Sequence, residues 1–246
     1  MGDFERYGDY NEIDESPKKG IVGRILKIFI VVLCLGIFAF LIFRVVIFNH
    51  YPKSMKKIYF TEELTAYYNE ASGEIGALTQ DMLNSNSYGY DDAKEGNFFC
   101  KYFVYIPATE ELQVTLKYNT SLMKNIEEKY GVSLDANAED NFTFRLVAVR
   151  ANDNLDENLP AEELGTPLNA TLVASEYDSF LMYRYVRLCF DGVDLSVGEE
   201  DAIDWIRLEV TVKGLENEKP YMIAIYLNDE ENFPLIPYKL SAKETP

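Results

Sequence analysis

Two acidic stretches of the chain place oxygen-bearing side chains at spacings that could bind a divalent cation. The first, residues 152–163, is similar in spacing to positions 1, 3, 5 and 12 of an EF-hand loop, and its candidate ligands are Asn152, Asn154, Asp156 and Glu163. An EF-hand begins with Asp and needs Gly at its sixth position, which is Glu157 here. The second stretch offers Asp191, Asp194 and Glu199. We therefore predict at most a loosely built calcium site, and the simpler alternative is solvated acidic loops between strands.

Other catalytic and cofactor-binding arrangements find little support. The single histidine, His50, directly follows the apolar segment described below, so the rest of the chain lacks the imidazole of a Ser-His-Asp or Cys-His system. Zinc sites need several Cys or His ligands within reach, and no nucleotide-binding or metalloprotease motif is present. Acidic residues are abundant, and a pair about 5–10 Å apart could serve a glycan hydrolase. That enzyme class is kept as an alternative, and no cofactor other than calcium is predicted.

One aromatic stretch is a candidate surface for ligand contact. Side chains alternate between the two faces of a strand, so Tyr183, Tyr185 and Arg187 share one face. Such a face suits stacking against carbohydrate or contact with a partner protein. It equally suits an inner face whose tyrosine hydroxyls reach the edge. The sequence leaves both interpretations open.

The three cysteines carry no motif. Cys34 lies within the apolar segment and is expected to pack as a small hydrophobic residue. Cys100 and Cys189 could form a disulfide in an oxidising compartment. Closing a loop of about 90 residues would then contribute about 4–5 kcal/mol on the chain-entropy model. Two separate buried thiols are the alternative.

A long apolar segment near the N-terminus indicates that the candidate residues belong to a membrane-anchored protein. An uninterrupted apolar run lies between Lys27 and Arg44. The wider segment Ile25–Phe48 covers about 24 residues, and a helix of this length can cross a hydrocarbon core of about 30 Å. A secretory signal has a shorter core and a small-x-small cleavage site, which the residues after Phe43 do not offer. We expect an uncleaved, single-pass signal anchor that contacts the lipid bilayer through Ile25–Phe48.

The expected orientation places the N-terminus in the cytoplasm and the C-terminal domain outside the cell. Four basic residues lie within about 20 residues of each end of the apolar segment, so the positive-inside rule does not decide. The N-terminal tail is short, however, and long C-terminal domains can be translocated largely regardless of their charge. Both features favour a cytoplasmic N-terminus.

The charge of the chain is concentrated beyond the apolar segment. Residues 1–50 contain six basic and six acidic groups, so the formal net charge of −18 belongs to residues 51–246. A domain this acidic is repelled by phosphate backbones, which argues against nucleic-acid binding. The charge is explained most simply by solubility, and a cation-binding or basic-partner surface is the alternative.

Four regions can be distinguished along the chain. Residues 1–24 are predicted to be a disordered tail and residues 25–48 the anchor. Residues 49–96 read as a juxtamembrane segment in which Thr61 caps a short helix. Ile75, Leu78 and Met82, at helical spacing, suggest a second helix, and residues 84–96 a loop. Residues 97–246 form the β domain.

Apolar residues recur with a period of two in this last region, which indicates strands. The expected strands cover residues 98–106, 112–118, 142–150, 170–175, 180–190, 206–212, 221–227 and 238–241, with a helix before Gly131. The first two strands suggest a hairpin with one buried and one solvated face. In residues 206–212, Leu208 is expected to be buried and Glu209 exposed. Short strands with local turns predict an antiparallel β-sandwich with one or two short helices.

The sequence thus predicts a single transmembrane helix followed by a mainly β domain. The leading hypothesis is a non-enzymatic binding or assembly module of the cell envelope, with a protein or carbohydrate ligand. The alternatives are a carboxylate-dependent glycan hydrolase and an accessory subunit of a membrane complex.

Overall fold

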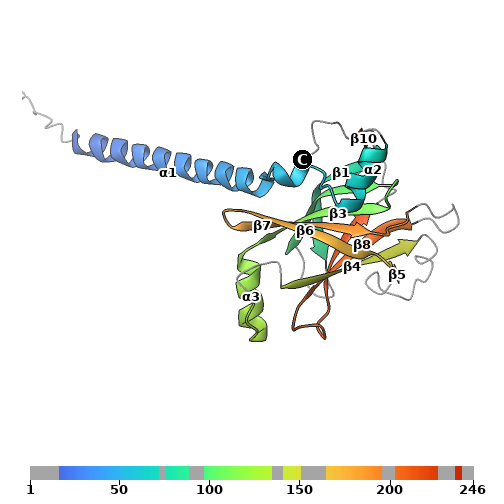
Figure 1. The fold of residues 1–246 in the computed structure, drawn as a ribbon. Helices are drawn as coiled ribbons and strands as arrows, with labels where there is room; N and C mark the ends of the chain where they lie inside the picture. Colours follow the sequence, from blue (N-terminus) through green and yellow to red (C-terminus); the bar gives the residue numbers. More distant parts are fainter. Residues whose placement is uncertain are drawn as a thin grey trace, which may run out of the picture. The chain divides into compact units, whose positions relative to one another are not determined.

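The computed structural model describes residues 17–71, 76–88, 97–134, 141–150, 165–195, 203–226 and 236–239. The chain divides into two compact units, residues 1–50 and residues 51–246. The first unit contains helix α1 (Pro17–Asn49) (Figure 1).

Helix α1 is long and apolar enough, over residues 20–49, to cross a membrane. It begins at Pro17 rather than at the expected Ile25. Proline is well tolerated at the first helical position because its missing N–H needs no partner there, and Lys18, Lys19 and Arg24 are compatible with helix. Part of the predicted disordered tail is therefore helical, and residues 1–16 lie outside the described residues.

The second unit is mainly β. In chain order its elements are η1 (Ser54–Lys56), α2 (Glu62–Glu70), β1 (Gly76–Tyr88), β2 (Phe98–Ile106), β3 (Glu111–Asn119), α3 (Ser121–Tyr130), β4 (Phe142–Arg150), β5 (Thr166–Pro167), β6 (Thr171–Phe180), β7 (Tyr183–Asp191), β8 (Ile203–Val212), β9 (Tyr221–Tyr226) and β10 (Ile236–Lys239).

Two antiparallel sheets face each other, which confirms the predicted β-sandwich (Figure 1). Sheet A has the order β10-β1-β2-β3-β7-β6, and sheet B has the order β5-β4-β8-β9-β1. Strand β1 belongs to both sheets, because residues 76–86 pair with β10 or β2 and residues 87–88 pair with β9. The core between the sheets takes alternate residues of each strand, such as Val114 of β3 and Leu208 of β8, both fully buried.

Strand β1 corrects the prediction of a second helix. The spacing of Ile75, Leu78 and Met82 is helical, yet residues 76–88 are extended and hydrogen-bonded to β2. The pairing shifts register between Asp81 and Ser85, and such an irregularity interrupts the period of two by which a strand is recognised. The strand also extends into the region predicted as a loop. Pairing with several neighbouring strands overrides the local spacing.

The outward face of β8 corrects a second expectation. Leu208 is buried as predicted, but Glu209 on the opposite face is only 5% exposed. Its carboxylate accepts hydrogen bonds from Arg145 Nε (2.9 Å) and Arg207 Nε (3.0 Å). Two arginines therefore cover a carboxylate that alternation alone placed in water.

The register of the strands also decides whether Cys100 and Cys189 can form a disulfide. Cys100 pairs with Leu116 of β3, and Cys189 pairs with Gln113 of the same strand. Directly paired residues lie on one face, and positions 113 and 116 of a strand lie on opposite faces. The two cysteines are therefore on opposite faces of sheet A and are free thiols. Burial raises the pKa of each thiol to about 12.

Candidate functional site

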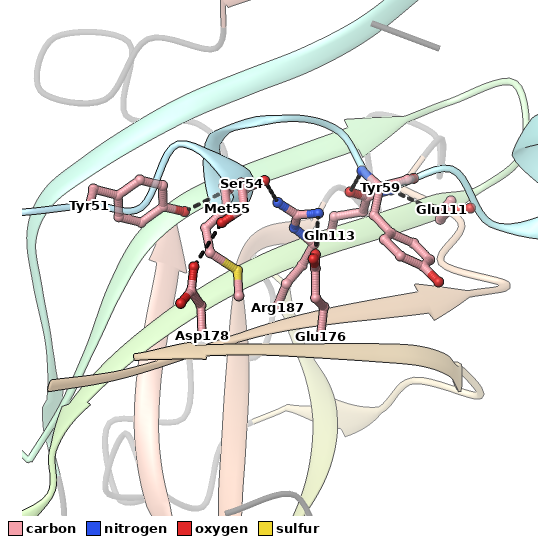
Figure 2. A network of polar contacts seen from close by, with 9 residues as sticks. All are labelled: Tyr51, Ser54, Met55, Tyr59, Glu111, Gln113, Glu176, Asp178 and Arg187. Atoms are coloured by element: carbon pink, nitrogen blue, oxygen red, sulfur yellow. Dashed lines mark hydrogen bonds and ion pairs between the residues drawn. The ribbon is translucent and has the colours of Figure 1, made fainter. Parts of the chain in front are cut away.

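The outer face of sheet A, which points away from the sandwich core, is covered by the chain itself. Residues 51–61, here called the strap, cross this face from β7 towards α2, and Figure 2 shows the polar contacts that hold them. The strap begins two residues after the end of α1 at Asn49. Several hydrogen bonds join it to β3, β6 and β7, so we treat it as the candidate functional site.

Gln113 of β3 binds the backbone of the strap on both sides of one residue. Its side-chain Oε1 accepts from the Tyr59 N–H at 2.9 Å, and its Nε2 donates to the Tyr59 carbonyl at 2.6 Å (Figure 2). The same Nε2 donates to Glu111 Oε1 at 2.6 Å. A primary amide offers a donor and an acceptor side by side, so Gln113 acts on Tyr59 as a neighbouring strand would.

Arg187 of β7 holds the other half of the strap. Its Nη2 donates to the Ser54 carbonyl, and its Nη1 lies 2.8 Å from Glu176 of β6. The Ser54 hydroxyl donates to Asp178 Oδ2 at 2.8 Å (Figure 2). The guanidinium is almost fully buried, and a buried charge is tolerated only when it is paired and hydrogen-bonded. Arg187 thus ties the strap to two strands at once.

Thr61 closes the strap at the start of α2. Its hydroxyl donates to Glu111 Oε2 at 2.6 Å and accepts from the Leu64 N–H at 3.1 Å. The second bond is the helix cap that the sequence predicts. Burial, opposed by the hydrogen bonds from Thr61 and Gln113, raises the pKa of the Glu111 carboxyl.

Apolar side chains fill the space beneath these polar contacts. Met55 is completely buried. The ring of Tyr51 packs edge-on against Tyr185 with 6.0 Å between ring centroids, and its hydroxyl donates to the Met55 carbonyl at 3.0 Å. Towards α2, a second small core combines strap, helix and strand residues, namely Ile58, Leu64, Tyr68, Ala77, Val104 and Ile106. The strap is therefore packed as an integral layer of the sandwich.

This layer explains why the face predicted to be solvated is dry. The outward residues of β3 are polar, as the alternation shows, yet Glu111, Gln113, Thr115 and Lys117 are all buried. Tyr183, Tyr185 and Arg187 do share one face as predicted, and the strap covers Tyr185 and Arg187. The Lys117 ammonium lies 3.8 Å from the centroid of the Tyr183 ring, and burial lowers its pKa to about 8.

An acidic pocket of about 360 Å³ adjoins the end of the strap. Four acidic residues line it, Glu62, Glu63, Glu111 and Asp191, together with Val173 and Ala174 of β6. Strand β6 is an edge of sheet A that, among the described strands, pairs only with β7. Its first three residues are exposed. The acidic pocket therefore adjoins the exposed start of this edge strand.

The predicted calcium ligands are placed only in part. Asn152, Asn154, Asp156, Glu163 and Glu199 lie outside the described residues. Asp191 lines the acidic pocket and accepts from the Gly192 N–H at 2.8 Å, and Asp194 lies on the segment after β7. Within the described residues, no group of three His, Cys, Asp or Glu side chains could hold a metal ion. The calcium site stays a prediction.

Comparison of the chain with protein-family models, curated proteins and solved structures gives no match. The class of protein defined by the structure is therefore a β-sandwich preceded by one apolar helix of membrane-spanning length.

Proposed function

We propose that this protein is a single-pass membrane protein whose β-sandwich lies outside the cell and serves as a non-enzymatic binding or assembly module of the cell envelope. Helix α1 supplies the membrane span. The N-terminus is cytoplasmic, and the sandwich holds a partner outside the cell.

The docked strap is the observation that carries this proposal. Only His50 separates Asn49, the last residue of α1, from Tyr51, the first residue of the strap. The linker along the chain is therefore short, and contacts from β3, β6 and β7 hold Ser54 and Tyr59 of the strap. A short, fixed tether suits a module that positions a partner at the membrane, because it limits the volume that the domain can sample.

The partner that the surface fits best is an extended protein segment with basic side chains. Edge strands have unpaired backbone groups that accept an added strand. Here the edge strand β6 adjoins a pocket lined by four acidic residues, and opposite charge favours the encounter. A basic side chain of the added strand would enter the pocket beside Val173.

A glycan hydrolase is the second candidate, favoured by one observation. Glu111 has a raised pKa and shares the pocket with Asp191, and a general acid near a second carboxylate is what glycoside hydrolysis needs. Glu111 is only 2% exposed, however, and both of its oxygens accept hydrogen bonds within the protein. This geometry supports a structural carboxylate better than an acid that must reach a leaving oxygen.

Topology is tested by adding protease to intact cells that express the full chain. We expect removal of the sandwich and retention of a membrane-bound fragment that contains α1. Complete protection until the membrane is permeabilised would contradict the outside location. Release of the whole chain by an alkaline wash would contradict the anchor.

The partner surface is tested with a photo-crosslinking amino acid at Val173 of β6, and at Asn217 in the exposed β8–β9 turn as the matched control. We expect a protein adduct at position 173 alone, and its loss in a Glu62→Gln/Glu63→Gln variant. Equal adducts at both positions, or an adduct that survives neutralisation of the pocket, would refute the acidic recognition. Solubilised glycan fragments released by the wild type but not by Glu111→Gln would favour the hydrolase.

A further inference from the structure

The turn between β6 and β7 exposes two large apolar side chains. Leu181 and Met182 join Phe180 to Tyr183, and they are 63% and 47% exposed. Leu181 has a φ of 52°, a left-handed conformation that hairpin turns usually assign to Gly, Asn or Asp. The geometry of the turn therefore disfavours leucine, and so does its exposure to water.

The strap enters sheet A at the end where this turn lies. Tyr51 packs on Tyr185, which is two residues, or about 7 Å, along β7 from Tyr183. The strap then runs away from the turn. Ser54 contacts Arg187, and Tyr59 is bound by Gln113, the partner of Cys189 in the sheet.

Along the chain, the start of the strap follows closely on the end of the span. Asn49 and Tyr51 are two residues apart, which bridges at most about 7 Å. The turn and the first residue of the strap lie at the same end of sheet A, and the strap begins two residues after the last residue of α1.

The side chains around this entry point suit a lipid surface. Lys53, Lys56 and Lys57 of the strap are exposed, although the chain has a net charge of −18. Clustered basic residues next to a span attract anionic headgroups. Phe180 and Tyr183 flank the apolar pair, and aromatic residues are enriched at the membrane interface.

We propose that the Leu181–Met182 turn inserts into the membrane that α1 crosses, while the strap lysines contact its anionic headgroups. This inference rests on the anchor in the proposed function. The turn gives the sandwich a second attachment point, because apolar side chains that enter the headgroup region add to the affinity supplied by basic residues. Two attachment points fix the angle at which the edge strand β6 faces a partner.

The test uses the full chain with Cys34→Ala, reconstituted in vesicles of phosphatidylcholine and phosphatidylglycerol. A polarity-sensitive dye is attached at Met182→Cys or, as the matched control, at Ala108→Cys. The β2–β3 turn that contains Ala108 is exposed and lies at the opposite end of sheet A, since Glu111 and Leu112 follow it and Leu112 pairs with Phe190. Cys100 and Cys189 are buried and their raised pKa keeps them protonated, so they label poorly.

We expect nitroxide-labelled lipids to quench the dye at position 182 but not at position 108. Replacement of the three strap lysines by glutamine, or vesicles of phosphatidylcholine alone, should weaken the quenching at 182. Equal quenching at the two positions, or none at 182 in protein that resists an alkaline wash, overturns the insertion and leaves the anchor standing. Release of the protein by that wash overturns the anchor as well.

Discussion

Replacing Gln113 with alanine should weaken the docking of the strap without unfolding the sandwich. The change removes two hydrogen bonds to Tyr59 and one to the Glu111 carboxylate. Neutral hydrogen bonds contribute about 1 kcal/mol net, and those to charged groups about 2 kcal/mol. Because Gln113 and Glu111 both lie on β3, only the two bonds to Tyr59 act directly on the strap, and the free energy of strap docking should fall by about 2 kcal/mol. Arg187, Met55 and Thr61 continue to hold the strap.

Trypsin reports this opening directly. Lys56 and Lys57 have exposed side chains, but a docked backbone resists the extended conformation that a protease needs. A loss of about 2 kcal/mol raises the undocked population about 25-fold, because each 1.4 kcal/mol is a factor of ten. When opening and closing are faster than cleavage, the cleavage rate rises by the same factor. When a protein of residues 51–246 is digested, mass spectrometry of the peptides measures the cleavage rate at each bond.

Two comparisons keep the result interpretable. Asn217→Ala removes an amide from the exposed β8–β9 turn and should leave the cleavage rate unchanged. Cleavage after Lys213, outside the strap, should not accelerate in Gln113→Ala, because global unfolding would expose every site together. Equal cleavage of the strap in Gln113→Ala and in the wild type would refute the view that Gln113 holds it.

Four further predictions concern residues 51–246. The pKa of Glu111 is raised, so the folded state binds a proton at this carboxyl more readily than the unfolded state does. The free energy of unfolding should therefore fall as pH rises through the range in which the carboxyl ionises. Thermal melts of Glu111→Gln should lack this dependence on pH. The pKa of Lys117 is lowered from 10.5 to about 8, so the wild type should gain stability relative to Lys117→Met as pH rises between those values, again in melts. Glu209→Ala leaves the buried Arg207 without its carboxylate and should cost about 3 kcal/mol in denaturant titrations, whereas an effect within about 0.5 kcal/mol would mean an exposed site. Calcium and chelator should give equal melting temperatures; a rise of several degrees in calcium, as expected for about 2.7 kcal/mol of stabilisation at a hundredfold excess over Kd, would establish the site.

The strands that the sequence reveals are those with an undisturbed period of two. Residues 98–106 and 142–150 are predicted with the bounds that β2 and β4 have. Thr61 caps the start of α2 and Gly131 ends α3, as expected. These two signals can be recognised in the sequence because a hydroxyl cap and a left-handed glycine act within one turn of helix. Strand β1 was missed because its register shift removes the local signal.

The candidate site depends on contacts that alternation cannot show. Polar residues at every second position of β3 predict a solvated face, and the same pattern results when a distant segment binds those residues. Gln113 and Tyr59 are 54 residues apart in sequence. The one signal in the sequence is Arg187 on the same strand face as Tyr183 and Tyr185, because a face with both charge and aromatic area suits contact with another segment.

Hydrogen exchange of the Tyr59 amide, in the full chain reconstituted in a membrane, tests the central claim most directly. This N–H donates to Gln113 Oε1 in the docked strap. If the strap fixes the sandwich to the span, residues 51–61 should exchange as slowly as β7, and Gln113→Ala should accelerate exchange in the strap alone. Exchange of the strap at the rate of an unfolded chain, with β7 still protected, would show that the sandwich hangs on a flexible linker and would contradict the account.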